Sequence, residues 1–456
     1  MTFSALDSSL TGPLFASDAM RAVFADAALI GAMLKAEAAL AQAEADAGLV
    51  PAGLAAAIGK VKAADLDLAA LGARTADAGV VTIPFVKAVE AKLPAALRGS
   101  FHKGATSQDI LDTAAALQMA EAFALIAEDI GAIMDGLTAL AKAHRRTPMA
   151  GRSYGQQAAP VTFGYVAASW LAGIADAAAA LPDARRRALV ATLAGPVGTL
   201  AALGGKGPAV AKAYAANLGL APASAGAHTA RGRIAASGAW LATLIGALAK
   251  MATDVVFLSA TEVGEVREAP APGRGGSSAM PHKQNPMSAT VILAAHAAAP
   301  GHVATLLAAM AAANQRPAGA WQAEWHALPA LFGLASGALR EGRRIAAHLV
   351  VDPARMRANL DATRGLLFAD AAAARLAPAL GREAAHALIE EAAATVRETG
   401  ASLRDVLAQD RRVPTATLDV AFDMSGAIDA AAAATNRAIR EAASGRRALA
   451  DRKGRT

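Results

Sequence analysis

The stretch that decides the fold is residues 276–286, GSSAMPHKQNP, which interrupts a chain of long Ala-rich segments. Asn is a favoured N-cap and Pro fits the first turn of a helix, so Asn285-Pro286 predicts a helix start. The positive end of that helix, with its free N–H groups, would then face the loop. Lys283 adds a full positive charge. The stretch therefore predicts a carboxylate-binding site, although its glycine and serines alone would also suit a linker.

Composition favours an all-helical protein. Of the 456 residues, 55% are hydrophobic but only 4% are aromatic, so the core must consist of Ala, Leu, Val and Ile. Ala is the best helix former. The chain has no cysteine, which excludes disulfides, a cysteine nucleophile and thiolate metal sites. The net charge is +6, but the basic residues are spread along the chain and nearly matched by 38 acids, so no nucleic-acid partner is expected.

Several long helices are expected to form a bundle. Thr106, followed three residues later by Asp109, resembles a capping box, and nothing breaks the helix from about 109 to 144. Such a helix would be about 50 Å long and needs partners along its length. Further long segments are predicted from about 160 to 182, from 231 to 265, and from 286 to an interruption at Pro300. No convincing strand is predicted.

The location predicted from the sequence is the cytoplasm, without a membrane partner. The first residues, MTFSALDSSLTG, lack the basic-then-apolar order of a signal peptide. The most apolar helical stretch, residues 234–249, is short for a bilayer span and suits a buried core helix better.

Three segments together carry a family resemblance. The loop is identical to the Gly-Ser-Ser-x-Met-Pro-x-Lys-x-Asn signature of the fumarase/aspartase superfamily at every specified position. Residues 102–109, HKGATSQD, and residues 151–156, GRSYGQ, resemble two further segments of that superfamily in the expected order. The resemblance implies an all-α, three-domain fold with a central bundle of long helices. It also implies a homotetramer whose active sites combine segments from three subunits.

The implied domains divide the chain into three parts. An N-terminal helical domain would span residues 1–105, and the central bundle with the signature loop would span 106–350. A C-terminal helical domain would span 351–456, where the helices become shorter and more charged.

One branch of the superfamily fits best. The lyases that produce fumarate carry a His in the second segment where this chain has Tyr154. Residues 83–87, 261–266, 319–325 and 380–386 resemble instead the bacterial 3-carboxy-cis,cis-muconate cycloisomerases of aromatic-acid breakdown. That branch has Trp at the position of Tyr154. Two alternatives stay open: a lyase of this superfamily acting on another dicarboxylate, such as an adenylosuccinate-type lyase, and a non-catalytic structural homologue.

The implied reaction closes a muconate carboxylate onto a double bond of the same molecule, giving a carboxymuconolactone without a cofactor. Ser277 would be the catalytic proton carrier. The negative charge that develops beside a second carboxylate must be stabilised by the protein. The implied substrate-binding residues are Lys283, Asn285, Thr106, Ser107, Gln156, Arg316, His102 and Tyr154.

Each of these residues also has an ordinary structural interpretation. Thr106 and Ser107 suit plain helix caps, and Arg316 suits a surface salt bridge. His102 suits a core or capping role, and Tyr154 suits a pocket wall. The pair Glu262 and Glu265 suggests a solvated helix face or pairing with Arg267. No metal site is predicted, because the nine His residues show no metal-binding spacing.

Overall fold

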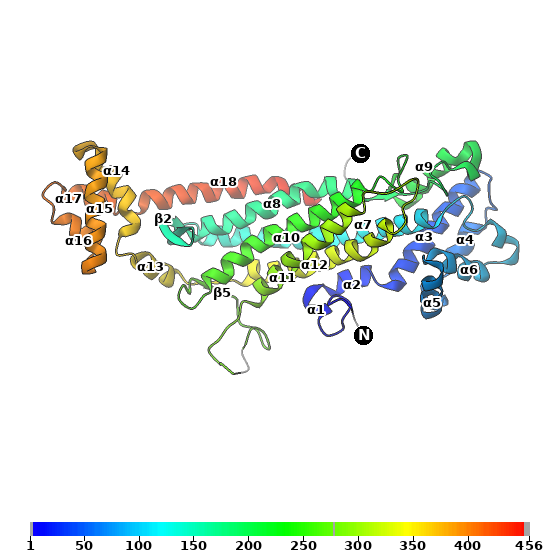
Figure 1. Ribbon diagram of the computed structural model, residues 1–456, viewed down its shortest axis with the longest axis horizontal. Helices are drawn as coiled ribbons and strands as arrows, with labels where there is room; N and C mark the ends of the chain where they lie inside the picture. Colours follow the sequence, from blue (N-terminus) through cyan, green and yellow to red (C-terminus); the bar gives the residue numbers. More distant parts are fainter. Residues whose placement is uncertain (1–2, 277–278, 451–456) are drawn as a thin grey trace.

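Long helices lie side by side through the middle of the molecule, as Figure 1 shows for the computed structural model, which describes residues 3–276 and 279–450. The long helices are α7 (Ser107–Ala143), α8 (Phe163–Ala188), α10 (Gly232–Leu258), α11 (Met287–Ala308), α12 (Ala320–His348) and α18 (Ser425–Ala450). One continuous hydrophobic cluster, rich in Ala, Leu and Ile, fills the space between them. The predicted all-α architecture is confirmed.

Small residues let these helices approach closely. A side chain added at Gly337 of α12 would lie 2.1 Å from the carbonyl oxygen of Phe15, which ends the short helix α1 (Gly12–Phe15). One added at Gly136 of α7 would lie 2.9 Å from the carbonyl oxygen of Ala346. Glycine at these two positions therefore permits close packing of the helices.

The predicted helix ends need correction. Helix α8 continues through Pro182 to Ala188, and α11 continues through Pro300 to Ala308. A proline costs one hydrogen bond inside a helix, but packing along a bundle stabilises the remaining turns. Helix α10 ends at Leu258, earlier than predicted.

The expectation of no strand was wrong for short segments. Strands β1 (Pro148–Ser153) and β2 (Gln156–Thr162) form an antiparallel hairpin. Its two-residue turn has left-handed φ at Tyr154 (53°) and Gly155 (76°), as the favoured hairpin turns require. The hairpin lacks an alternating apolar pattern, which is why sequence reasoning missed it. Two more pairs of short strands form: β3 (Val190–Ala191) pairs with β4 (Ala221–Pro222), and β5 (Val266–Arg267) pairs with β6 (Val350–Val351).

The N-terminal part of the chain has its own hydrophobic cluster at one end of the bundle (Figure 1). The helices that contribute to it are α3 (Asp26–Asp46), α4 (Leu54–Ile58), α5 (Leu68–Ala78), α6 (Thr82–Lys92) and α9 (Gly207–Leu218). The buried residues of α2 (Asp18–Val23) belong to the central cluster instead. Short 3-10 helices cover Ala63–Asp65, Ala95–Ser100 and Ala201–Lys206. Helix α3 packs on the beginning of α7.

A third cluster lies at the opposite end of the bundle (Figure 1). Its elements are α14 (Ala369–Leu380), α15 (Arg382–Thr399), α16 (Leu403–Ala408) and α17 (Thr415–Ala421), reached through α13 (Pro353–Asp361) and the 3-10 helix Leu366–Phe368. Helix α18 then returns along α8 in the central bundle. The domain boundaries at 105 and 350 stay a prediction.

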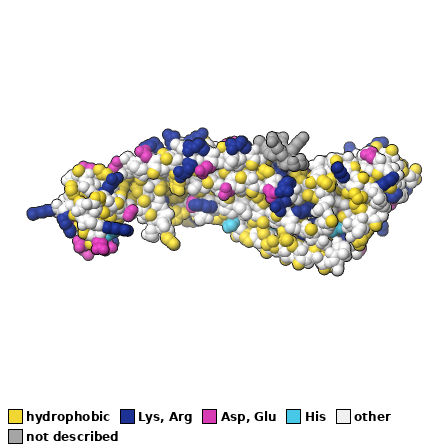
Figure 2. Space-filling view, turned by 90° about the horizontal axis from the view of Figure 1, so that it is seen from above, with side chains coloured by type: hydrophobic (Ala, Val, Ile, Leu, Met, Phe, Trp, Pro, Cys, Tyr) yellow, Lys and Arg dark blue, Asp and Glu magenta, His cyan; other side chains and the backbone are white. Residues whose placement is uncertain are grey.

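Four of the described helices are long and apolar enough, by length and composition alone, to cross a membrane: α7, α8, α10 and α11. Within the chain, the apolar window is 67% buried in α7 but only 28% buried in α11. Most of the apolar surface of α11 is therefore not covered by its own chain. On the face seen in Figure 2, Lys and Arg side chains are distributed along the molecule rather than gathered in one patch.

Candidate active site

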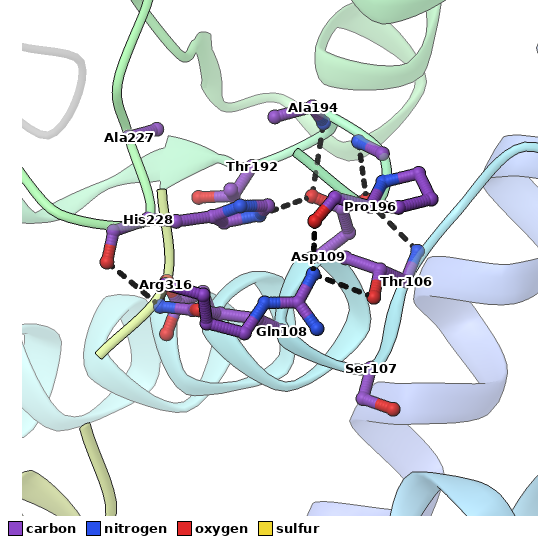
Figure 3. A network of polar contacts seen from close by, with 12 residues as sticks. Thr106, Ser107, Gln108, Asp109, Thr192, Ala194, Pro196, Ala227, His228 and Arg316 are labelled. Carbon is purple, nitrogen blue, oxygen red and sulfur yellow. Dashed lines mark hydrogen bonds and ion pairs between the residues drawn. The ribbon is translucent and has the colours of Figure 1, made fainter. Parts of the chain in front are cut away.

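A buried carboxylate, Asp109, organises the start of α7 (Figure 3). Its Oδ1 accepts hydrogen bonds from the backbone N–H of Ala194 at 2.9 Å and from Nε2 of His228 at 2.8 Å. Its Oδ2 accepts from the N–H of Gly195 at 2.9 Å and of Thr106 at 3.0 Å. The bond to Thr106 is the capping contact predicted from the sequence. Asp109 thus fixes the first turn of α7 against two distant segments.

Arg316 reaches this helix start from the segment before α12. Its Nη2 donates to Oγ1 of Thr106 at 2.8 Å and to the carbonyl oxygen of Pro196 at 2.9 Å. Both partners are neutral, and its buried Nε has no hydrogen-bond partner among the described residues. The surface salt-bridge interpretation of Arg316 was therefore wrong.

The start of α7 has the properties of an anion site. The helix dipole places partial positive charge at Ser107, and Arg316 adds a full charge beside Thr106. Figure 3 shows the Ser107 side chain directed away from the Asp109 network, so its hydroxyl is not used there. The structure thus brings Thr106, Ser107 and Arg316 together, as a carboxylate site requires.

His102 lies in the turn before α7 and contacts α3. Its Nδ1 lies 2.6 Å from Oε1 of Glu37, whose side chain is 1% exposed. Burial acts to lower the pKa of His102, but the hydrogen bond and charge of Glu37 outweigh burial and raise that pKa above its ordinary value. His102 therefore does not cap a helix but makes a mostly buried contact with a carboxylate of α3.

Ser277 of the signature loop lies outside the described residues. The neck of the loop is a backbone contact in which the N–H of Asn285 donates to the carbonyl oxygen of Gly275 at 2.8 Å. Asn285 is half-buried and Lys283 is exposed. The base of the loop is held by Arg274, which pairs with the buried carboxylate of Glu341 on α12.

The prediction of free N–H groups at the start of the helix after the loop was wrong. Helix α11 begins at Met287, one residue later than predicted. The carboxylate of Glu268 accepts from the N–H groups of Ser288 and Ala289, each at 2.9 Å. Because a chain carboxylate already occupies this helix end, its N–H groups are not available to a substrate carboxylate.

The hairpin of the second segment follows the end of α7 that is opposite to Thr106. Tyr154 and Gln156 sit at its turn with exposed side chains, so neither lines a pocket within this chain. Arg152 donates from Nη2 and Nη1 to Oε1 and Oε2 of Glu265 at 2.6 and 2.9 Å. Glu265 therefore pairs with Arg152, and the expected pairing with Arg267 was wrong.

One chain does not bring the three segments together. Thr106 precedes α7 and Gln156 follows it, and the 37 residues of α7 span about 55 Å at 1.5 Å per residue. On α12, Trp321 donates to Asp112 near the start of α7, whereas Glu341 holds the signature loop. These positions are separated by 20 residues of helix, or about 30 Å.

Sequence reasoning missed a buried charge network one turn below Asp109. Arg231 donates to Asp112 at 2.5 Å and also pairs with Glu324, and Nε1 of Trp321 donates to Asp112 at 3.0 Å. Burial acts to raise the pKa of Asp112, but the charge of Arg231 outweighs it and lowers that pKa. These side chains also line a cavity of about 510 Å³ whose other walls are mostly apolar. In the sequence, Trp321 and Glu324 of the 319–325 segment were the residues that could have pointed to this network.

Comparison with known proteins gives the family. A lyase family profile matches residues 14–301, and a profile of the adenylosuccinate lyase C-terminus matches residues 365–438. The chain belongs to the fumarase/aspartase lyase family. The resemblance noted in the sequence is thereby confirmed.

Relatives share most of the chain's length. A 3-carboxy-cis,cis-muconate cycloisomerase from Pseudomonas putida is 43% identical over 91% of this chain and 98% of its own. One from Bradyrhizobium diazoefficiens is 43% identical over 89% of this chain and 91% of its own. A nitrosuccinate lyase from Streptomyces davaonensis is 41% identical over 95% of each.

Solved structures match the fold. The 3-carboxy-cis,cis-muconate lactonizing enzyme from Pseudomonas putida superposes with a TM-score of 0.91 at 40% identity, covering 96% of this chain and 99% of that one. A fumarate lyase from Mesorhizobium sp. BNC1 superposes with a TM-score of 0.87 at 35% identity, covering 93% and 98%.

Proposed function

We propose that the protein is a 3-carboxy-cis,cis-muconate cycloisomerase, acting without a cofactor in aromatic-acid catabolism. The observation that carries this proposal is the 43% identity to cycloisomerases over about nine-tenths of the chain. The intact signature loop and the cationic start of α7 support it, since the substrate carries three carboxylates.

In this reaction a substrate carboxylate oxygen forms a bond to an alkene carbon, and the adjacent carbon takes one proton. Arg316, Thr106 and Ser107 bind one carboxylate at the start of α7. Lys283 and Asn285 stabilise the carboxylate that carries the developing charge, and stabilising that charge speeds the reaction. Ser277 delivers the proton.

The active site is shared between chains, in a homotetramer. In one chain the start of α7 lies tens of ångströms from the hairpin with Gln156 and Tyr154 and from the signature loop, so a site containing all three needs other copies. The uncovered apolar face of α11 supports the same arrangement, because other copies would bury it. Burial between copies, rather than in a bilayer, also fits a cytoplasmic location.

The test is a direct assay with Ser277→Ala as the decisive variant. Wild type mixed with 3-carboxymuconate should bleach the diene absorbance, and Ser277→Ala should lose at least a thousandfold in kcat. The variant's sedimentation as a tetramer and its melting temperature should match wild type. A variant that retained most of its rate would refute the role of Ser277, and an inactive wild type would refute the proposed reaction.

A nitrosuccinate lyase is the second candidate, because one such relative is 41% identical over 95% of the chain. Elimination from nitrosuccinate would give fumarate and nitrite. Assaying nitrite release in parallel with diene loss therefore separates the two reactions, and the substrate with the higher kcat/KM identifies the activity.

A further inference from the structure

The contact between His102 and Glu37 has features that the fold alone does not require. His102 has a left-handed backbone, with φ of 56°, which is uncommon for a residue other than glycine. Its Nδ1 is 2.6 Å from a carboxylate that is buried in α3. Strained backbone is retained where the surroundings hold it in place, and it concentrates at functional sites.

The other nitrogen of the ring is available for an external partner. The His102 side chain is 18% exposed, and no described residue forms a hydrogen bond with its Nε2. The ring precedes Thr106 by four positions, in the same turn that leads into the anion site. Asp109, in the first turn of α7, acts electrostatically on the ring, so the ring lies near the start of that helix.

The charges around the ring favour its protonated form. Glu37 and Glu44 of α3 and Asp109 of α7 all act to raise the pKa of His102, against the effect of burial. Lys103, the neighbouring cation, acts to lower the pKa of Glu44. Both ring nitrogens of a protonated histidine are donors, so Nε2 then offers a proton to an anion.

We propose that Glu37 is a positioning residue, which orients His102 so that its Nε2–H binds a carboxylate of the substrate at the start of α7. The identity of that polyacid rests on the proposed function, but the contact between the two side chains does not. Glu37 acts only through the ring, since its own carboxylate is buried.

Glu37→Gln tests the proposal because it keeps a hydrogen-bond acceptor of the same size and removes the charge. Glu44→Gln is the matched control: Glu44 lies two turns along the same face of α3, is equally buried, and has no hydrogen bond with His102. Burial raises the pKa of Glu44 to about 8, so its carboxyl is mostly uncharged at pH 7 and the substitution removes little charge there. At pH 7, Glu37→Gln should raise KM for carboxymuconate about tenfold and leave kcat within about twofold. Glu44→Gln should change neither. An unchanged KM for Glu37→Gln, or an equal rise for both variants, would overturn the proposal.

Two further measurements do not depend on catalytic turnover. Imidazole NMR titration of the whole protein, with His102→Asn to assign the signal, should show His102 titrating at least half a pH unit lower in Glu37→Gln. Calorimetry with tricarballylate, a saturated tricarboxylate, should show weaker binding to that variant. An unchanged titration midpoint would overturn the proposal even if the enzyme is active. If wild type leaves carboxymuconate unchanged, the proposed reaction fails, and these two readouts still decide the role of Glu37.

Discussion

Replacing Asp109 by asparagine should loosen the anion site while keeping the shape of the side chain. Four donors share the two carboxylate oxygens, and an amide has only one acceptor oxygen. On the Oδ2 side both donors are backbone N–H groups. On the Oδ1 side, His228 can present its lone pair to the new NH2 group, which leaves only the N–H of Ala194 without an acceptor.

The expected destabilisation follows from that count. One orphaned buried donor costs about 1–3 kcal/mol, and the two bonds that keep an oxygen lose the assistance of the negative charge. We expect a total of about 2–5 kcal/mol for Asp109→Asn. The apparent melting temperature should fall by roughly 2–5 °C, because the unfolding entropy of a chain this long is about 1 kcal/mol per kelvin. Because the bond that holds the Thr106 N–H loses its charge assistance, kcat/KM should fall about tenfold.

The assay is a thermal melt together with steady-state kinetics at pH 7. Asp183→Asn is the control, because Asp183 is an exposed acid on α8 whose ion-pair partners among the described residues are the surface residues Arg186 and Arg187. A surface ion pair contributes about 0–1 kcal/mol, so this control should melt close to wild type. If Asp109→Asn also melted close to wild type and kept its kcat/KM, the organising role of Asp109 would be refuted.

Three further outcomes are expected. Burial and then the charge of Glu37 raise the pKa of Glu44 to about 8 from 4.5, so its burial costs stability as pH rises from about 5 to 8. Glu44→Gln should therefore flatten the pH dependence of the urea midpoint and be more stable than wild type at pH 9. Glu265→Gln leaves Arg152 without its charge partner and should lower the free energy of unfolding in urea by about 3 kcal/mol. The double variant, which also carries Arg152→Met, should recover part of that loss. Gly337→Ala should lower the melting temperature by several degrees, because its methyl group would lie 2.1 Å from a backbone oxygen, whereas Gly31→Ala, with open space around it, should not.

Local patterns in the sequence were sufficient for the helices and the family. The cap from Thr106 to Asp109 and the uninterrupted run after it predicted α7, because capping and helix propagation depend on residues within four positions. The signature loop identified the superfamily, since its residues are contiguous. The helix ends at Pro182 and Pro300 were mispredicted because packing along the bundle outweighs the local cost of proline.

Within the site, the sequence named Thr106 and Arg316 but not how they meet. Their contact joins positions 210 residues apart, and a pattern of neighbouring residues carries no information on such a distance. The same holds for the hairpin turn at Tyr154, whose geometry follows from the pairing of two strands without an apolar alternation.

The sequence by itself determined the helical class, the family and the residue types of an anion site, because these follow from local propensity and contiguous motifs. Only the tertiary structure decided which charges remain free. It placed Glu268 on the helix end expected to bind substrate, placed Glu37 against His102, and left Arg316 with neutral partners. The physical reason is that a charge is neutralised by what packing brings within about 3 Å, whatever its distance along the chain.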